Sequence, residues 1–196
     1  MSTVSYRKKI IDAVLELGAK SPDLTTITFK QLAKHCKISE PQISKEFRDM
    51  AHLFYEASIS LITEHEKRSM KIVQLPGEYA LSTLLRHDLT LLHLYERDRD
   101  TFREKRTAPS AINHVANYVD SKMPLYYFEI LRMNTNLLPN KQINAKLYAH
   151  FIVHSMFFFS REELYGPDAD RATLLNISRQ IISTLFQNKE IDIKYT

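Results

Sequence analysis

Two histidines, His150 and His154, stand four positions apart in this sequence. On a helix this spacing places both imidazoles on one face, where they could share a metal ion. The H-E-x-x-H pattern of zinc proteases is absent, because Phe151 follows His150. Since the surrounding residues are mostly apolar, we interpret the pair as core or interface histidines. The sequence therefore predicts no metal site and no cofactor.

The other reactive side chains also give no catalytic set. The single cysteine, Cys36, falls on the inner face of a predicted helix, which indicates a buried and unreactive thiol. A lone cysteine also excludes an internal disulfide and agrees with a reducing compartment. With only three glycines, the chain has no glycine-rich loop to cradle a phosphate. We therefore expect a protein that is not an enzyme.

Aromatic residues are frequent between Tyr79 and Phe159 and have two interpretations. Most must pack in a core. Some could instead line a pocket for a largely apolar small molecule, since tyrosine joins an apolar ring to a polar hydroxyl, and a histidine could orient that ligand. The candidate effector-binding residues are His87, Tyr95, Phe102, Tyr118, Met123, Tyr126 and Tyr127.

The most informative stretch runs from Thr28 to Leu53. Its apolar residues recur at helical spacing and predict two short helices joined by a tight turn. Thr28 and Ser39 can cap these helices, and Ala33 is small enough for the helices to cross closely. This is the pattern of a helix-turn-helix, whose second helix enters the major groove of DNA. Five basic residues against two acidic ones between Phe29 and Arg48 fit a surface that neutralises phosphates.

A leading helix from Tyr6 to Gly18, the segment TFKQLAKHC, the turn KIS and a helix ending at Phe47 together resemble the TetR family of bacterial repressors. The match covers roughly the first 55 residues. Three positions depart from the family pattern. Lys37 replaces a usual turn glycine, Ser44 a phosphate-binding tyrosine, and Met50 a lysine that opens the fourth helix.

The resemblance implies a set of DNA-binding residues on the hairpin. We expect Gln42 and Lys45 to face the groove and the others to meet phosphates, with Thr28 also capping its helix. The full set is Thr28, Lys37, Gln42, Ser44, Lys45 and Arg48.

The whole chain is expected to be all-α, because no stretch alternates like a strand. We expect about nine helices, with an N-terminal three-helix helix-turn-helix domain over residues 1–50. A helical ligand-binding and dimerisation domain should follow over residues 51–196. One long helix should run from Ala108 to Asn134 with a kink at Pro124. The last two helices are apolar on several sides and predict a homodimer interface that includes Phe151, Phe158, Leu174 and Ile181.

The 196 residues carry a net charge of +4 and a pI of about 9.0, which suits a nucleic-acid partner. Neither a signal segment nor an apolar run long enough for a bilayer is present, so we expect a bacterial cytoplasmic protein without a membrane partner. The sequence predicts a repressor that binds a palindromic operator in double-stranded DNA as a dimer and is released by a small-molecule effector. The alternative is a helical ligand-binding or protein-interaction module that has lost direct DNA binding, as the departures at Ser44 and Met50 allow.

Overall fold

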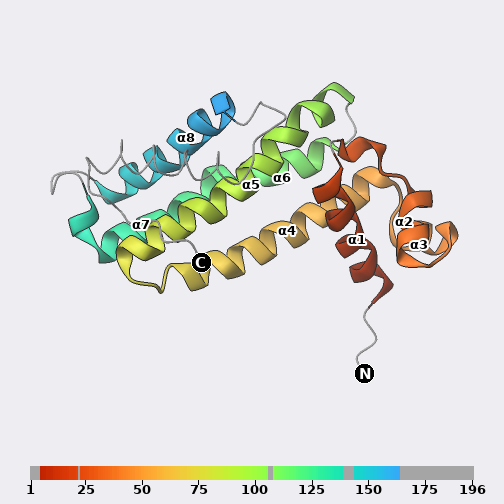
Figure 1. The fold of residues 1–196 in the computed structure, drawn as a ribbon, viewed down its shortest axis with the longest axis horizontal. Coiled ribbons are helices and arrows are strands. Elements are labelled where there is room, and N and C mark those ends of the chain that lie inside the picture. Colours follow the sequence, from red (N-terminus) through yellow and green to blue (C-terminus); the bar gives the residue numbers. More distant parts are fainter. Residues whose placement is uncertain (1–4, 22, 106–107, 139–143, 164–196) are drawn as a thin grey trace. The chain divides into compact units, whose positions relative to one another are not determined.

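The computed structural model describes residues 5–21, 23–105, 108–138 and 144–163, without the side chains of 93–105 and 157–163. Every regular element in these ranges is helical, so the all-α prediction is confirmed (Figure 1). The elements are α1 (Tyr6–Lys20), η1 (Leu24–Thr26), α2 (Phe29–Cys36), α3 (Glu40–Glu46), α4 (Met50–Ile72), α5 (Gly77–Lys105), α6 (Pro109–Ser121), α7 (Met123–Met133), η2 (Thr135–Leu137) and α8 (Ala145–Glu163). The expected last helix, from about Ala169 to Phe186, lies outside the described residues.

The chain divides into two compact units. Unit 1 comprises Met1–Glu64 and Asp98–Ala116, and unit 2 comprises His65–Arg97 and Asn117–Thr196. The helices α4, α5 and α6 therefore each contribute residues to both units. The functional boundary expected at residue 50 stays a prediction.

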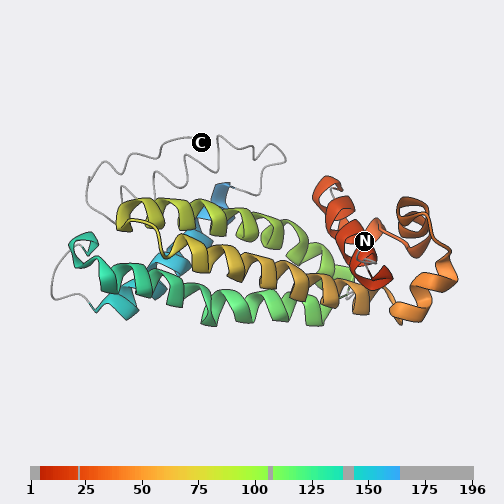
Figure 2. The same ribbon diagram turned by 90° about the horizontal axis from the view of Figure 1, so that it is seen from below.

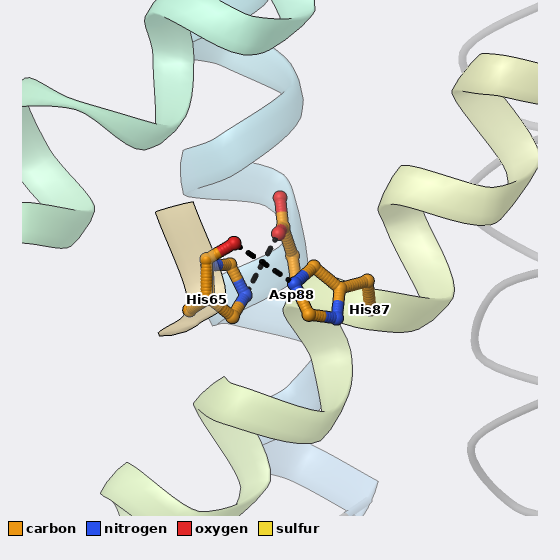
Figure 3. A group of neighbouring side chains, drawn as sticks. All are labelled: His65, His87 and Asp88. Carbon is orange, nitrogen blue, oxygen red and sulfur yellow. Dashed lines mark hydrogen bonds and ion pairs between the residues drawn. The ribbon is translucent and has the colours of Figure 1, made fainter. Parts of the chain in front are cut away.

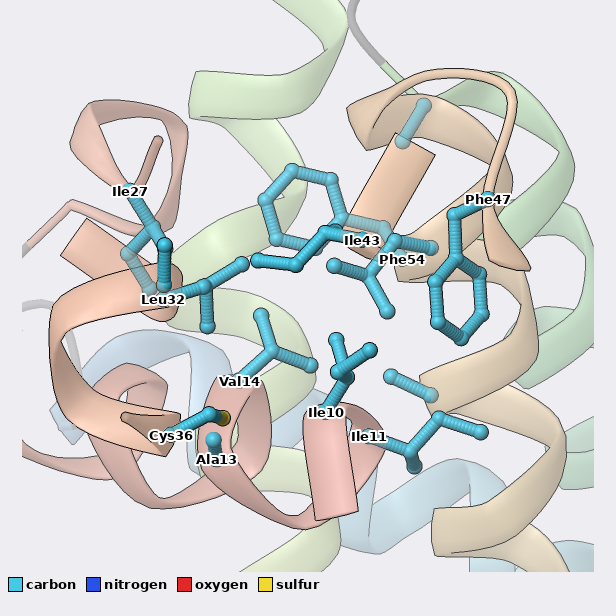
Figure 4. Close-up of a cluster of buried hydrophobic side chains, with 14 of the residues drawn as sticks. Ile10, Ile11, Ala13, Val14, Ile27, Leu32, Cys36, Ile43, Phe47 and Phe54 are labelled. Carbon is cyan, nitrogen blue, oxygen red and sulfur yellow. The ribbon is translucent and has the colours of Figure 1, made fainter. Parts of the chain in front are cut away.

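In unit 1, the helices α1, α2 and α3 pack around one apolar core (Figure 4). Ile10 of α1, Leu32 of α2 and Ile43 of α3 are fully buried there. Phe47 and Phe54 close the core from the chain that follows α3. The apolar positions that predicted the helical hairpin thus form its inner side, and burial of these side chains supplies most of the stability of such short helices.

Gly18 does not end the first helix, as its residue type suggested, because α1 continues to Lys20. The glycine instead leaves room for the Leu24 side chain. A Cβ at this position would lie 2.4 Å from a methyl carbon of Leu24. Residue 18 therefore lets η1 pack directly against the last turn of α1.

In unit 2, α5 buries a stripe of leucines at helical spacing. Leu81, Leu84, Leu85, Leu89 and Leu92 are all fully enclosed. The helices α7 and α8 lie side by side, and contacts from His65 join the end of α4 to α5 and α6 (Figure 2). None of the helices in the described part of the chain is long and apolar enough to cross a membrane.

The expected single helix with a kink at Pro124 is wrong. The chain forms two helices, α6 and α7, with a break at Lys122. Pro124 lies in the first turn of α7, where its missing N–H has no helical partner to lose. Starting a new helix therefore costs less than forcing the proline into a helix interior. The charged run from Arg97 to Lys105 is also part of a helix, since α5 continues through it.

Candidate functional site

The helical hairpin of unit 1 is fixed by caps at both of its helices. The Thr28 hydroxyl accepts from the Gln31 N–H at 3.3 Å, and the Gln31 carboxamide oxygen accepts from the Thr28 N–H at 2.8 Å. In α3 the Gln42 carboxamide oxygen accepts from the Ser39 N–H at 2.8 Å. These reciprocal bonds satisfy N–H groups that a helix start leaves open, so the sequence itself sets where α2 and α3 begin.

The turn between α2 and α3 passes through Lys37 in the left-handed conformation, with φ 55° and ψ 48°. Among the described residues it is the one non-glycine with positive φ. A side chain there costs about 1–2 kcal/mol relative to the right-handed region. The expected strain at this departure from the glycine pattern is therefore present, and the turn keeps an exposed cationic side chain in return.

The six expected DNA-binding residues all lie exposed on the hairpin and its C-terminal flank. The opposite side of the same helices is buried through Leu32, Ala33 and Ile43. The exposed surface also carries Lys30 and Lys34, whereas its acidic residues are few. The hairpin therefore presents a polar, largely basic face that can reach a nucleic acid without disturbing the core.

Besides Thr28, which caps α2, two of these six side chains have partners within the protein. The Gln42 carboxamide oxygen also accepts from the Ser39 hydroxyl at 3.0 Å. The Arg48 Nε lies 2.9 Å from the Asp49 carboxylate, in an exposed ion pair. An exposed pair of this kind is weak enough to exchange for a phosphate. The Gln42 amide NH₂ can donate to a base while its oxygen keeps the cap.

Arg7 of α1 holds the end of α3 and was not singled out from the sequence. Its guanidinium donates to the backbone carbonyl of Glu46 at 2.9 Å. Glu46 is the last residue of α3. It also pairs with Glu56 at 3.0 Å and lies over the Phe47 ring, 4.7 Å from the centroid. A cation at a helix C-terminus satisfies an open carbonyl and opposes the helix dipole. Arg7 is therefore a positioning residue for α3.

Replacing Arg7 with methionine should lower the free energy of unfolding by about 1.5–3 kcal/mol, the usual contribution of a hydrogen bond from a charged group. The apolar stem is conserved, so the loss reports the guanidinium. Lys8→Met, an exposed position one residue away on α1, is the matched control and should change stability by less than about 0.5 kcal/mol. Urea unfolding of both variants measures this. Equal effects of the two changes would remove the positioning role of Arg7.

Five of the seven expected effector-binding residues have side chains that the structure describes, and all five lie in unit 2. Tyr118, Met123 and Tyr127 are buried in unit 2, and His87 and Tyr126 are half-buried there. The side chains of Tyr95 and Phe102 lie outside the described part of the chain, and residue 102 belongs to unit 1. The five described residues thus share one unit and surround a polar cluster.

That cluster contains two residues that the sequence did not single out, His65 and Asp88. The His65 Nε2 lies 3.2 Å from the Asp88 carboxylate, and its Nδ1 is 2.8 Å from the Tyr118 hydroxyl. The His65 and His87 rings stack with centroids 3.9 Å apart. A signal for Asp88 was present, because this acid stands in the middle of the buried leucine stripe of α5. No signal connected it to His65, which lies 23 residues earlier.

Burial dominates the titration of this cluster. It raises the pKa of Tyr118, Tyr126 and Tyr127, and the nearby Asp88 carboxylate raises all three further. Burial also lowers the pKa of His87, helped by the adjacent His65. At neutral pH the three phenols therefore stay protonated, and His87 is a neutral imidazole.

No protein-family model and no curated protein sequence matches the chain. By structure it matches the transcriptional regulator FadR from Bacillus subtilis, solved in complex with stearoyl-CoA. The TM-score is 0.60 with 12% sequence identity, over 91% of this chain and 97% of that one. A TetR/AcrR-family regulator from Thermobifida fusca gives a TM-score of 0.60 and 17% identity, over 93% and 97% of the two chains.

The chain has the fold of the TetR-family regulators. Both matches span nearly the whole of each chain, so the TetR-like fold includes unit 2 as well as the helix-turn-helix. The resemblance seen in the sequence stopped near residue 55. The structural likeness therefore extends the TetR-like fold over a region where the sequence pattern gave only length and helical layout.

The expected dimer residues of this TetR-like fold are described only in part. Phe151 on α8 has an exposed fraction of 54%, and Leu147, one turn earlier, has 71%. The side chain of Phe158 and the residues Leu174 and Ile181 lie outside the described part of the chain. The dimer interface stays a prediction.

Proposed function

We propose that this protein is a transcriptional regulator that binds double-stranded DNA through the helical hairpin of unit 1. The observation that carries the proposal is the exposed, largely basic face of α2 and α3 on a TetR-like fold. A regulator without catalytic activity agrees with the regulators that share this fold. The finer assignment is a repressor that acts as a homodimer on a palindromic operator.

Selection of bound fragments from random or genomic DNA tests this proposal directly. Enrichment of a two-fold symmetric sequence, with half-sites about one helical turn apart or a multiple of it, is the expected result. Retention on heparin should fall steeply as salt is raised. Failure to enrich any sequence, together with weak heparin retention, would favour a helical module that has lost direct DNA binding.

Gln42→Glu separates the cap of α3 from DNA recognition at the same residue. Glutamate can replace glutamine in a capping box, and its charge suits a helix N-terminus, so the melting temperature should stay the same or rise. The change also removes the amide donors and places a negative charge near phosphates. We expect DNA affinity to fall at least tenfold. Gln31→Glu is the matched control, because Gln31 and Thr28 form the equivalent cap of α2. It makes the same change of side chain within a cap, away from the second helix of the hairpin.

The effector is proposed to be a small, largely apolar molecule that contacts unit 2. FadR was solved with stearoyl-CoA, which has a long apolar chain. In this chain the half-buried His87 and Tyr126 are the accessible candidates beside buried aromatic residues. The helix α4 carries residues of both units and is the element through which binding could change DNA affinity. A coupling of about 1–3 kcal/mol would lower operator affinity roughly 5- to 150-fold.

Dimerisation is proposed through α8 and the segment that follows it. The exposed Phe151 and Leu147 support this assignment, because they lie one turn apart on α8 and offer apolar surface. Sedimentation at micromolar concentration, before and after a charged substitution at Phe158, tests it. A monodisperse wild-type monomer would exclude both the dimer and the palindromic operator.

A further inference from the structure

His65, His87 and Asp88 converge in the interior of unit 2 (Figure 3). His65 comes from α4, and the other two are neighbours on α5. Each residue offers one ligand atom, and these three atoms lie within 4.8 Å of one another. On a tetrahedral Zn²⁺ with bonds of about 2.0–2.1 Å, ligand atoms stand roughly 3.4 Å apart. The His65 and His87 rings are stacked nearly parallel, with centroids 3.9 Å apart, and an imidazole binds a metal in its ring plane. One ring must therefore turn out of the stack for all three atoms to reach one ion.

Asp88 has the strongest need for a partner. Its side chain is fully buried, and its polar neighbours are the His65 Nε2, 3.2 Å from one carboxylate oxygen, and the Tyr127 hydroxyl. Neither neighbour forms a well-directed hydrogen bond to the carboxylate oxygens. A buried carboxylate held this weakly is unfavourable, and a bound cation would stabilise its charge.

The Tyr118 hydroxyl holds the other ring nitrogen of His65. The His65 Nδ1 is 2.8 Å from the Tyr118 hydroxyl, so an Nδ1–H can donate there when a metal ion binds the Nε2 lone pair between His65 and Asp88. Metal-bound histidines in proteins are commonly fixed by a hydrogen bond of this kind from the other ring nitrogen. The Ser69 hydroxyl donates to the His65 carbonyl at 3.0 Å and further anchors the residue.

His87, which directly precedes Asp88 on α5, is the third proposed ligand. Its Nε2 faces the other two residues and makes a long contact of 3.3 Å with the His65 carbonyl, which a metal bond could replace (Figure 3).

We propose that His65, His87 and Asp88 bind one divalent transition-metal ion, with Zn²⁺ as the best-suited ion. Two imidazoles and one carboxylate are a common zinc ligand set and leave a fourth position for water or another ligand. A His65–Asp88 ion pair alone would use one carboxylate oxygen.

The surface of α8 carries a competing pair that any test must remove. His150 and His154 lie one helical turn apart with ring centroids 6.4 Å apart, and both are accessible. The double variant His150→Ala, His154→Ala therefore serves as the background protein. It leaves the buried cluster unchanged.

The full-length background protein is freed of metal with EDTA, dialysed, and titrated with ZnCl₂ against a chromophoric chelator. One Zn²⁺ per chain should bind, and the melting temperature should rise by roughly 5–10 °C at a 100-fold excess over Kd. Co²⁺ in place of Zn²⁺ should give the visible absorption of a tetrahedral site. The measurement does not depend on DNA binding.

Three variants in this background identify the ligands. His87→Ala and Asp88→Asn should each weaken Zn²⁺ binding more than 100-fold, and Tyr118→Phe, which acts through His65, should weaken it 10- to 100-fold. Asp88→Asn removes a buried charge, so the metal-free protein should melt at the same or a higher temperature. This variant keeps the test valid if His87→Ala fails to fold. Zinc affinity that is unchanged by Asp88→Asn, or lost entirely with His150 and His154, would overturn the proposal.

Discussion

Replacing Lys37 and Arg48 together with alanine should lower DNA affinity roughly 4,000-fold at about 0.1 M salt. Each phosphate that loses its cation reduces the salt slope by about 0.9. Two residues in each of two protomers correspond to four phosphates, and hence to a slope change of about 3.6. Alanine keeps the Cβ at residue 37, so the strain of the left-handed turn is unchanged and stability should be too.

The size of the loss in affinity also indicates whether one or two protomers contact the DNA through their hairpins. A monomer would lose two phosphate contacts, which gives a slope change of about 1.8 and a loss of roughly 60-fold. Fluorescence anisotropy over a series of salt concentrations measures both quantities. Lys67→Ala with Lys71→Ala removes two exposed lysines of α4 outside the hairpin and is the control. If the control lost as much affinity as the test variant, the hairpin would not be the DNA-binding surface.

Replacing Tyr127 with alanine should lower the free energy of unfolding by about 3–5 kcal/mol, the usual cost of removing a large aromatic side chain from a core. The ring is fully buried in unit 2, and its hydroxyl donates to the Met156 sulfur at 3.3 Å. Tyr127→Phe is the matched control. It keeps the ring but loses the hydroxyl contacts with the Met156 sulfur and the Asp88 carboxylate, so it should cost less than Tyr127→Ala, about 1–3 kcal/mol.

This prediction distinguishes two neighbouring candidates for the effector site. Tyr126 is half-buried, so Tyr126→Ala should leave the melting temperature closer to wild type while it weakens the response to an effector. Measuring the melting temperature beside operator affinity, with and without effector, separates packing from ligand contact. A stable Tyr127→Ala protein that no longer responds to effector would place residue 127 in the binding site instead of the core.

The N-terminal hairpin could be predicted from sequence because its determinants are local. Thr28, Ser39 and Gln42 cap helices through residues three positions away, and the buried face follows from helical spacing. The left-handed turn at Lys37 was expected from the family resemblance, which has a glycine at this position. In contrast, the outcome at Pro124 was missed. A kink within one helix and the start of a second helix are both compatible with a proline at residue 124. Which of the two forms depends on how α6 and α7 pack against the rest of the protein.

The sequence by itself determined the all-α class, the caps and inner face of the helix-turn-helix, and the leucine stripe of α5. All of these depend on contacts between residues a few positions apart. The tertiary structure decided which distant residues meet. Arg7 reaches Glu46 across 39 positions, and His65 of α4 meets Asp88 of α5 beside Tyr118 of α6. Such contacts cannot be read from helical periodicity, because the packing of one helix against another fixes them.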